Sequence, residues 1–161
     1  MGQRKQNDFQ WTEVMMLTQR IPKIKRDYKM YLNNKRLHQE NTIKYLGIII
    51  DRRFNFNAHI DYTTGKCIKF IHALSKSAKV NWCLWHDVLR IIYSGAILPI
   101  LSYRALVWIE NLQRNSNALK LKWIQRLINI KIAKAYRTIL HEALSVLTGI
   151  TPIMTELENL A

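Results

Sequence analysis

The spacing of apolar residues divides the chain into two parts that meet near Asp51. Before this residue, short apolar runs and alternation of apolar and polar positions predict β-strands. After it, apolar residues recur every three to four positions, as they do on one face of a helix. We therefore expect an α+β protein: a polar segment over residues 1–11, a small antiparallel sheet within residues 12–57, and a helical bundle over residues 58–161.

Strand-like patterns cover residues 13–18, 28–32, 35–38 and 42–50. Asn33 and Asn34 are predicted to form a hairpin turn between the second and third of these, because asparagine tolerates the positive φ that such turns need. The stretch TIKYLGIII is the longest of the four and is expected to be one strand. Gly47 interrupts it, which predicts a β-bulge or a close approach of the backbone to another group.

Helical patterns cover residues 58–80, 86–108, 117–132 and 138–147. The second is apolar almost all round and is expected to kink at Pro99. The fourth is expected to end at Gly149, with Pro152 just beyond. In the third helix, the residues predicted to face inward are Leu121, Ile124, Leu127 and Ile128, and those predicted to face outward are Lys120, Lys122, Gln125 and Arg126.

The first of these helices has two contrasting faces. Its apolar positions are Ile60, Cys67, Phe70, Ile71, Leu74 and Ala78. Its basic positions are Lys66, Lys69, His72, Lys76 and Lys79. Such a row of cations can follow a phosphate backbone. The same spacing also suits the solvated outer face of a bundle helix, so this helix alone leaves both interpretations open.

The net charge favours binding. The chain has 25 Lys and Arg against 11 Asp and Glu, a net charge of +14 in 161 residues. A domain this basic usually meets a polyanion, with nucleic acid as the first candidate and an anionic membrane surface as the rival. Residues 91–109 carry a single charge, Arg104, and approach the ~20 apolar residues of a membrane span. Arg104 and Pro99 favour a buried helix instead, so no membrane partner is predicted.

Reactive groups are not gathered in any recognisable pattern. The aspartates are isolated in sequence, whereas two-metal catalysis needs several carboxylates around ions ~4 Å apart. Glu156 and Glu158 are expected to lie on a ragged C-terminus. The best metal candidates are Cys67 with His72 and Cys83 with His86. Because the first two project from opposite faces of one helix, we predict core thiols rather than a metal site, in an intracellular protein that is not secreted.

Three ordered segments carry a resemblance to a known family: NTIKYLGIIIDRRFNFNAHID, VLRIIYSGAILPILSYRALVW and AYRTILHEALSVLTGITPI. They resemble the end of the palm and the thumb of reverse transcriptases from non-LTR retrotransposons, the jockey-like elements especially. The resemblance implies that residues 12–57 are the end of the palm and residues 58–161 a thumb-like domain. It also implies that Tyr45, Leu46 and Gly47 belong to the primer-grip region.

The resemblance further implies a nucleic-acid interface without a catalytic site. The parent activity is RNA-directed DNA synthesis with Mg²⁺, primed at a chromosomal target, and its carboxylates are expected upstream of Trp11. We therefore expect no catalytic residue and no cofactor in this chain, and an intracellular location with the nucleus as a candidate. An RNA–DNA hybrid or duplex is the expected partner, contacted through its backbone. The expected contacts are Lys66, Lys69, Lys76 and Lys79, with a second strip of Lys120, Lys122 and Arg126.

Two departures from the family pattern keep an alternative open. Trp11 stands where the family commonly has a lysine, and Arg104 stands where it has a glycine after Tyr103. The chain could therefore be a non-functional structural relic of a decayed element, which folds marginally or needs a partner. The sequence gives no indication of the oligomeric state.

Overall fold

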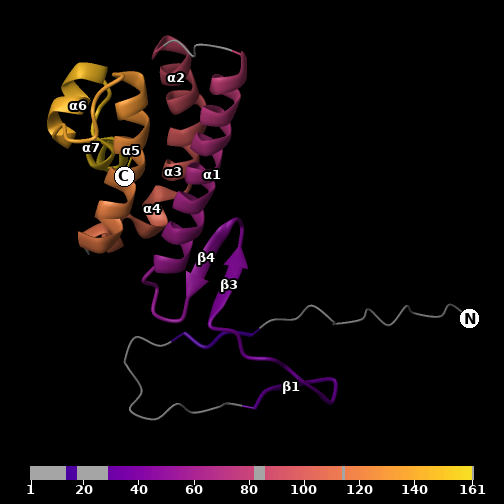
Figure 1. Cartoon of the computed structure of the whole chain (residues 1–161). Helices are drawn as coiled ribbons and strands as arrows, with labels where there is room; N and C mark the ends of the chain where they lie inside the picture. Colours follow the sequence, from indigo (N-terminus) through magenta and orange to yellow (C-terminus); the bar gives the residue numbers. More distant parts are fainter. Residues whose placement is uncertain (1–13, 18–28, 82–85, 114, 161) are drawn as a thin grey trace, which may run out of the picture. The chain divides into compact units, whose positions relative to one another are not determined.

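The computed structural model describes residues 14–17, 29–81, 86–113 and 115–160. The chain forms two compact units, Met1–Asn55 and Phe56–Ala161 (Figure 1). The first unit contains two small antiparallel sheets, and the second is helical. The predicted α+β class, with a sheet region before a helical bundle, is confirmed.

The first hairpin of the N-terminal unit forms where two asparagines predict it. Strands β1 (Tyr31–Leu32) and β2 (Lys35–Arg36) pair antiparallel. Asn33 and Asn34 lie between them with φ of 48° and 62°. Two consecutive positive φ values are what a tight two-residue hairpin turn requires, and asparagine reaches them at little energetic cost.

The second hairpin corrects the prediction of one long strand over residues 42–50. The chain instead forms β3 (Thr42–Tyr45) and β4 (Ile48–Asp51), paired antiparallel with Tyr45 opposite Ile48. Leu46 and Gly47 make the turn, with φ of 46° and 83°. Gly47 therefore supplies the second left-handed residue of a two-residue turn and does not form a bulge.

The predicted strand over residues 13–18 is not found in the part that the structure describes. Val14 forms only an isolated parallel bridge to Gln39, and residues 15–17 have no regular structure. Glu13 and Thr18 lie outside the described residues.

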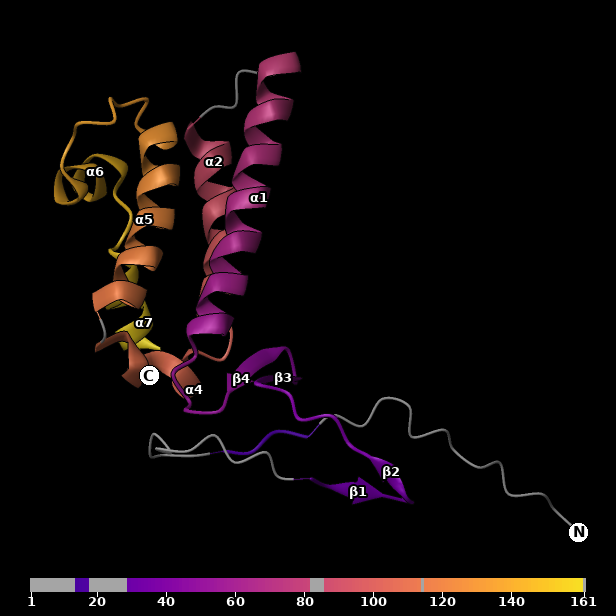
Figure 2. The same ribbon diagram turned by 60° about the horizontal axis from the view of Figure 1, so that its bottom comes forward.

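The second unit is built from helices, most of them short. They are α1 (Asn57–Asn81), α2 (His86–Ile92), the π-helix η1 (Tyr93–Ile97), α3 (Leu98–Ser102), α4 (Ala105–Trp108), the 3₁₀ helix η2 (Ile109–Gln113), α5 (Asn115–Ile132), α6 (His141–Thr148) and α7 (Ile153–Asn159). Figures 1 and 2 show α5 between α1 and α6. Helix α5 contacts α1, α2, α6 and α7, so it is the centre of the bundle.

The long first helix forms as predicted and buries part of its predicted apolar face. Ile60, Cys67 and Ile71 are buried, as that prediction requires. Leu74 is half-buried, Phe70 is more than a third exposed, and the side chain of Ala78 lies outside the described residues. Phe70 lies one residue, or about 100° around the helix, from Ile71, at the edge of the buried stripe.

The main break in this helical run does not fall at the predicted Pro99. Pro99 lies in the first turn of α3, where a missing N–H is tolerated, directly after the π-helix η1. The chain breaks later, between α3 and α4, where Arg104 has φ of 53° and the helices bend by 44°. The buried Trp108 bridges this break, since its indole Nε1 donates a 3.1 Å hydrogen bond to the carbonyl oxygen of Tyr103.

The same bent run was the candidate membrane segment. Over the described residues, no single helix is both long and apolar enough to cross a bilayer. The pair His86–Ser102 and Ala105–Leu112 meets those two criteria only when taken together across its bend.

Gln125 is buried, which corrects the prediction that it faces solvent. Its exposed fraction is 0%, and its amide makes three hydrogen bonds. The Nε2 atom donates to the Tyr93 hydroxyl at 3.0 Å and to the carbonyl oxygen of Thr151 at 2.7 Å. The Oε1 atom accepts from the backbone N–H of Ile153 at 2.9 Å. One side chain of α5 thus holds η1 and the start of α7.

The end of the chain also differs from the prediction. Gly149 follows α6 in the left-handed conformation, with φ of 62°, as expected for the residue that ends a helix. The predicted ragged terminus is instead α7, which buries Ile153 and Leu157 and carries Glu156 and Glu158. A seven-residue helix is too short to show a clear 3.6-residue period in the sequence.

Replacing Gln125 by methionine tests the role of its amide. Gln125→Met keeps a similar volume but leaves the Ile153 N–H and the Thr151 carbonyl without their partner. We expect the free energy of unfolding to fall by about 3 kcal/mol, the order of cost of leaving buried polar groups unsatisfied. Urea unfolding measures this. Lys122→Met on the same helix, at an exposed position, is the control and should change stability by less than about 0.5 kcal/mol. Equal losses in the two variants would contradict the role assigned to Gln125.

Two glycine substitutions test the backbone conformation at Gly149 and Gly65. Gly149→Ala should destabilise the helical unit by about 1 kcal/mol, because alanine is strained at a left-handed position. Gly65→Ala should stabilise it by about 0.5–1 kcal/mol, because Gly65 lies inside α1 and a Cβ there meets nothing within 4 Å. Thermal unfolding of both variants gives the two signs, and shifts of the same sign would contradict this account.

Candidate nucleic-acid interface

The residues assigned to the primer-grip region form the tip of the β3–β4 hairpin. Tyr45 ends β3, and its side chain is 63% exposed; Leu46 begins the turn and is 65% exposed. A leucine in the left-handed region is strained, because its Cβ crowds the backbone. Strained backbone positions cluster at functional sites, which makes this tip a candidate contact.

Asp51, which follows three isoleucines, has a structural role. Its Oδ1 accepts hydrogen bonds from the backbone N–H groups of Arg53, at 2.9 Å, and Asn55, at 3.0 Å. The carboxylate therefore holds the turn that leads out of β4, as aspartates often do at the end of a strand. This aspartate forms a turn, and no cluster of three His, Cys, Asp or Glu side chains that could hold a metal is found among the described residues.

The basic face of α1 is exposed along the helix. Lys66, Lys69, His72 and Lys76 are all exposed, opposite the buried apolar face. The Nζ atom of Lys66 lies 4.3 Å from the centroid of the Tyr62 ring. From Lys66 to Lys76 the helix rises about 15 Å, enough to contact several phosphates. Lys79 lies within α1, but its side chain is outside the described residues.

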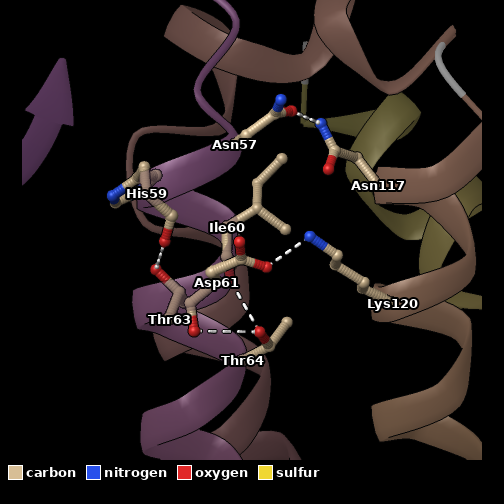
Figure 3. Close-up of polar contacts among 8 residues, drawn as sticks. All are labelled: Asn57, His59, Ile60, Asp61, Thr63, Thr64, Asn117 and Lys120. Atoms are coloured by element: carbon tan, nitrogen blue, oxygen red, sulfur yellow. Dashed lines mark hydrogen bonds and ion pairs between the residues drawn. The ribbon is translucent and has the colours of Figure 1, made fainter. Parts of the chain in front are cut away.

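The second predicted strip, on α5, is partly engaged within the fold. Lys120 forms an ion pair with Asp61 of α1 (Figure 3). Arg126 donates from Nη2 to the carbonyl oxygen of Arg137 at 2.6 Å. Lys122 is exposed and forms no ion pair within the described residues. The structure therefore places these three cations on one helix but leaves Lys122 with the greatest freedom to bind a ligand.

Polar contacts fix α1 against α5. Asn117 of α5 is buried and donates to Oδ1 of Asn57, at the start of α1, at 2.7 Å (Figure 3). The Lys120–Asp61 pair lies one turn further along both helices. These contacts hold the cations of the two helices at a constant spacing. Sequence reasoning missed this pairing, because lone asparagines carry no periodic signal.

Two buried side chains of α1, Cys67 and His59, have pKa values shifted by their burial. Burial raises the pKa of the Cys67 thiol to about 11, so the thiol stays protonated and is a poor metal ligand. Burial lowers the pKa of His59 below its ordinary 6.5, and the charge of Lys66 lowers it further. The His59 ring packs near Trp108, with centroids 6.1 Å apart.

The zinc candidates are not brought together where the structure describes them. Cys67 is buried, whereas His72 is exposed on the opposite side of α1. Across the described ranges, no three His, Cys, Asp or Glu side chains are placed to hold one metal ion. Cys83 lies outside the described residues.

Comparisons with known proteins identify relatives of this chain. It is 31% identical over 132 residues to a retrovirus-related Pol polyprotein from a type-1 retrotransposable element R1 of Nasonia vitripennis, covering 82% of this chain and 33% of that protein. It is 30% identical over 121 residues to the corresponding R1 Pol polyprotein of Bradysia coprophila, covering 75% and 12%. A putative 115 kDa protein in the R1DM element of Drosophila melanogaster is 28% identical over 110 residues, covering 68% and 11%.

No protein-family profile matches the chain, and no solved structure does. The chain spans a third or less of the length of these three relatives. It is a retrotransposon-derived sequence. More closely, it is related to the Pol polyproteins of R1 non-LTR elements, which confirms the family expected from the three ordered segments.

The buried His59 predicts a pH-dependent stability. Because its folded pKa lies below 6.5, the unfolded chain binds a proton more readily as the pH falls. Stability should therefore be full above pH 6.5 and should decrease as the pH falls toward the folded pKa. His59→Gln should reduce this decrease in urea unfolding at about pH 7.5 and pH 5. An equally steep decrease in the variant would show that His59 is not a source of the effect.

Proposed function

We propose that this chain corresponds to the end of the palm and the thumb of a non-LTR reverse transcriptase, and that it binds the backbone of an RNA–DNA hybrid or duplex. The row of exposed cations on α1 is the observation that carries the proposal. Its opposite face is packed into the bundle, so the helix presents these cations from a rigid support. Ordered cations on a helix lose less conformational entropy on binding than cations on a loose segment.

The three segments that resemble reverse transcriptases support this assignment, because each falls on a defined structural element. The first covers β3, β4 and the start of α1; the second runs from α2 to α4; the third includes α6. The relatives are named as Pol polyproteins.

The β3–β4 hairpin is proposed as the counterpart of the primer grip. Tyr45 and Leu46 present exposed side chains at its tip, and Gly47 carries no side chain that would obstruct a nucleic-acid strand. A tyrosine ring can stack on a base or sugar, while the turn backbone comes close to the strand.

We propose that this chain binds nucleic acid but does not itself synthesise DNA. Lysines on a helix face contact phosphates and read no bases, so recognition should follow the shape of the duplex. The described residues bring no set of carboxylates together, so the Mg²⁺ of the parent enzyme is not assigned to them. The proposed nucleic-acid partner is consistent with an intracellular location, with the nucleus as a candidate, and no membrane role is proposed.

A salt series tests the interface. Fluorescence anisotropy would follow binding of a primed RNA–DNA hybrid to the wild type and to a variant with Lys66, Lys69, Lys76 and Lys79 changed to Ala. Each lost phosphate contact should reduce the log–log salt slope by about 0.7–0.9, so the slope should fall by about three. A matched variant with Lys29, Lys35, Lys131 and Lys134 changed to Ala removes the same number of charges elsewhere and should keep the slope. Equal slopes in all three proteins would contradict the role of α1.

A second candidate, a structural relic that needs a partner to be stable, is favoured by one observation. Helix α6 and its flank expose large apolar side chains, with Leu140 72%, Val146 81% and Leu147 63% exposed. Such surface is unusual for a self-sufficient domain and is typical of one that another part of a protein covers. The same salt series separates the two candidates, because a relic would bind no hybrid or would precipitate.

A further inference from the structure

An open groove of about 770 Å³ lies between α1, α5 and α6. Asp61, Thr64 and Ile68 line it from α1, and His141 and Glu142 line it from α6. The α5 side carries the largest groups, which are Trp123, Lys122 and Arg126. All three helices belong to the helical unit, so the groove is a feature of one compact body.

Trp123 is the main apolar surface of the groove. Its side chain is 48% exposed, although Leu121 and Ile124 of the same helix are buried. An indole left half in water is a large apolar surface without a cover, and its flat π-face can stack on another planar ring. The ring therefore offers a platform at the edge of the bundle core.

The charges around this platform are positive on balance. Asp61 is neutralised by Lys120, with which it is paired. Lys122 and Arg126 then face the single carboxylate of Glu142. The hydrogen bond from Arg126 to the Arg137 carbonyl uses one of the five guanidinium N–H groups, so the others can reach an anion.

His141 supplies polar atoms without partners at the α6 wall. Among the described residues, neither of its ring nitrogens has a hydrogen-bond partner, and both are shielded from water. Burial lowers the pKa of His141 and Glu142 raises it, while Arg126 and Lys122 lower it further. These nitrogens lie inside the α6 wall, so the positive charge that the groove presents to a ligand comes from the α5 side chains.

The groove continues onto the basic face of α1. His72 follows Ile68 by four residues and Lys76 follows His72 by four, so the three side chains lie along one side of the helix. A strand that leaves the groove at Ile68 would therefore meet His72 and Lys76 next. An apolar peptide in the groove would gain nothing from that row of cations.

We propose that this groove binds an unpaired nucleotide of a single-stranded RNA or DNA, with its base stacked on Trp123 and its phosphates on Lys122 and Arg126. The strand then continues along the cations of α1. The inference rests on the proposed function and deepens it, because it adds single-stranded nucleic acid to the hybrid that α1 contacts. Stacking of this kind tolerates any base, so the site has little sequence preference.

The test compares a short single-stranded oligonucleotide with a blunt-ended RNA–DNA hybrid by fluorescence anisotropy, using the full chain. Trp123→Ala should weaken single-strand binding about tenfold and leave hybrid binding unchanged. Its salt slope for the single strand should stay that of the wild type, because a stacking contact releases no counterion. Lys122→Ala should instead reduce that slope by about 0.7.

Two controls separate stacking from general damage. Tyr136→Ala removes an aromatic side chain that is 84% exposed and does not line the groove, and it should bind both ligands like the wild type. Trp123→Phe keeps a ring and should recover most of the single-strand affinity. An oligonucleotide made abasic throughout should bind the wild type as weakly as the normal oligonucleotide binds Trp123→Ala.

The outcomes distinguish this inference from the function on which it rests. If Trp123→Ala binds the single strand as well as the wild type while the hybrid still binds, the inference is overturned and the α1 interface stands. If a synthetic peptide of alternating glutamate and leucine binds in a Trp123-dependent way and the oligonucleotide does not, the groove is a protein-docking site and the inference is overturned. If the wild type binds neither nucleic acid, both proposals fail.

Discussion

The hydrogen bonds of the buried Gln125 amide determine how the C-terminal part of the helical unit is held. The first N–H groups of a helix have no acceptor within the helix. Pro152, at the N-cap of α7, supplies no side-chain acceptor, and Gln125 supplies one from α5 by accepting the Ile153 N–H. The same amide donates to the Thr151 carbonyl and the Tyr93 hydroxyl, so α7 and η1 are fixed to one side chain. The hydrogen bonds to Tyr93 and Ile153 are buried and the one to Thr151 is partly buried, which makes the arrangement costly to disturb.

The hydrogen bonds of Gln125 also influence the proposed binding surface of α1 and α5. Because α5 is anchored to η1 and α7 on one side, its other contacts determine where α1 lies. The Asn57–Asn117 hydrogen bond and the Asp61–Lys120 pair set the position of α1 along α5. Together they fix the groove that contains Trp123 and the direction in which the α1 cations extend from it. These polar contacts between α1 and α5 therefore position the basic face of α1.

Long helices could be predicted from the sequence, and short elements could not. Helices α1 and α5 each repeat the apolar period over several turns, so their limits were predicted within about two residues. The Asn33–Asn34 turn was also predictable, since its residue types match its backbone. The β3–β4 turn was missed because leucine is a poor residue for the left-handed position that Leu46 occupies. Pro99 misled because a proline in the first turn of a helix looks, in sequence, like one in its interior.

The candidate site also contains features that the sequence predicted and features that it did not. The basic face of α1 follows from lysines at helical spacing, and the structure exposes those that it describes. Gln125, by contrast, was assigned to the outward face with Lys120, Lys122 and Arg126, because sequence shows residue type and not the partners that satisfy it. Lys120 and Arg126 likewise looked available, yet both make contacts within the fold. Binding a phosphate with Lys120 would break its ion pair with Asp61, and Arg126 has already used one of its N–H groups, whereas Lys66, Lys69 and Lys76 form no ion pair within the described residues. The α1 face should therefore contribute more of the backbone affinity than the α5 strip, and α5 should contribute chiefly through Trp123, Lys122 and the remaining N–H groups of Arg126.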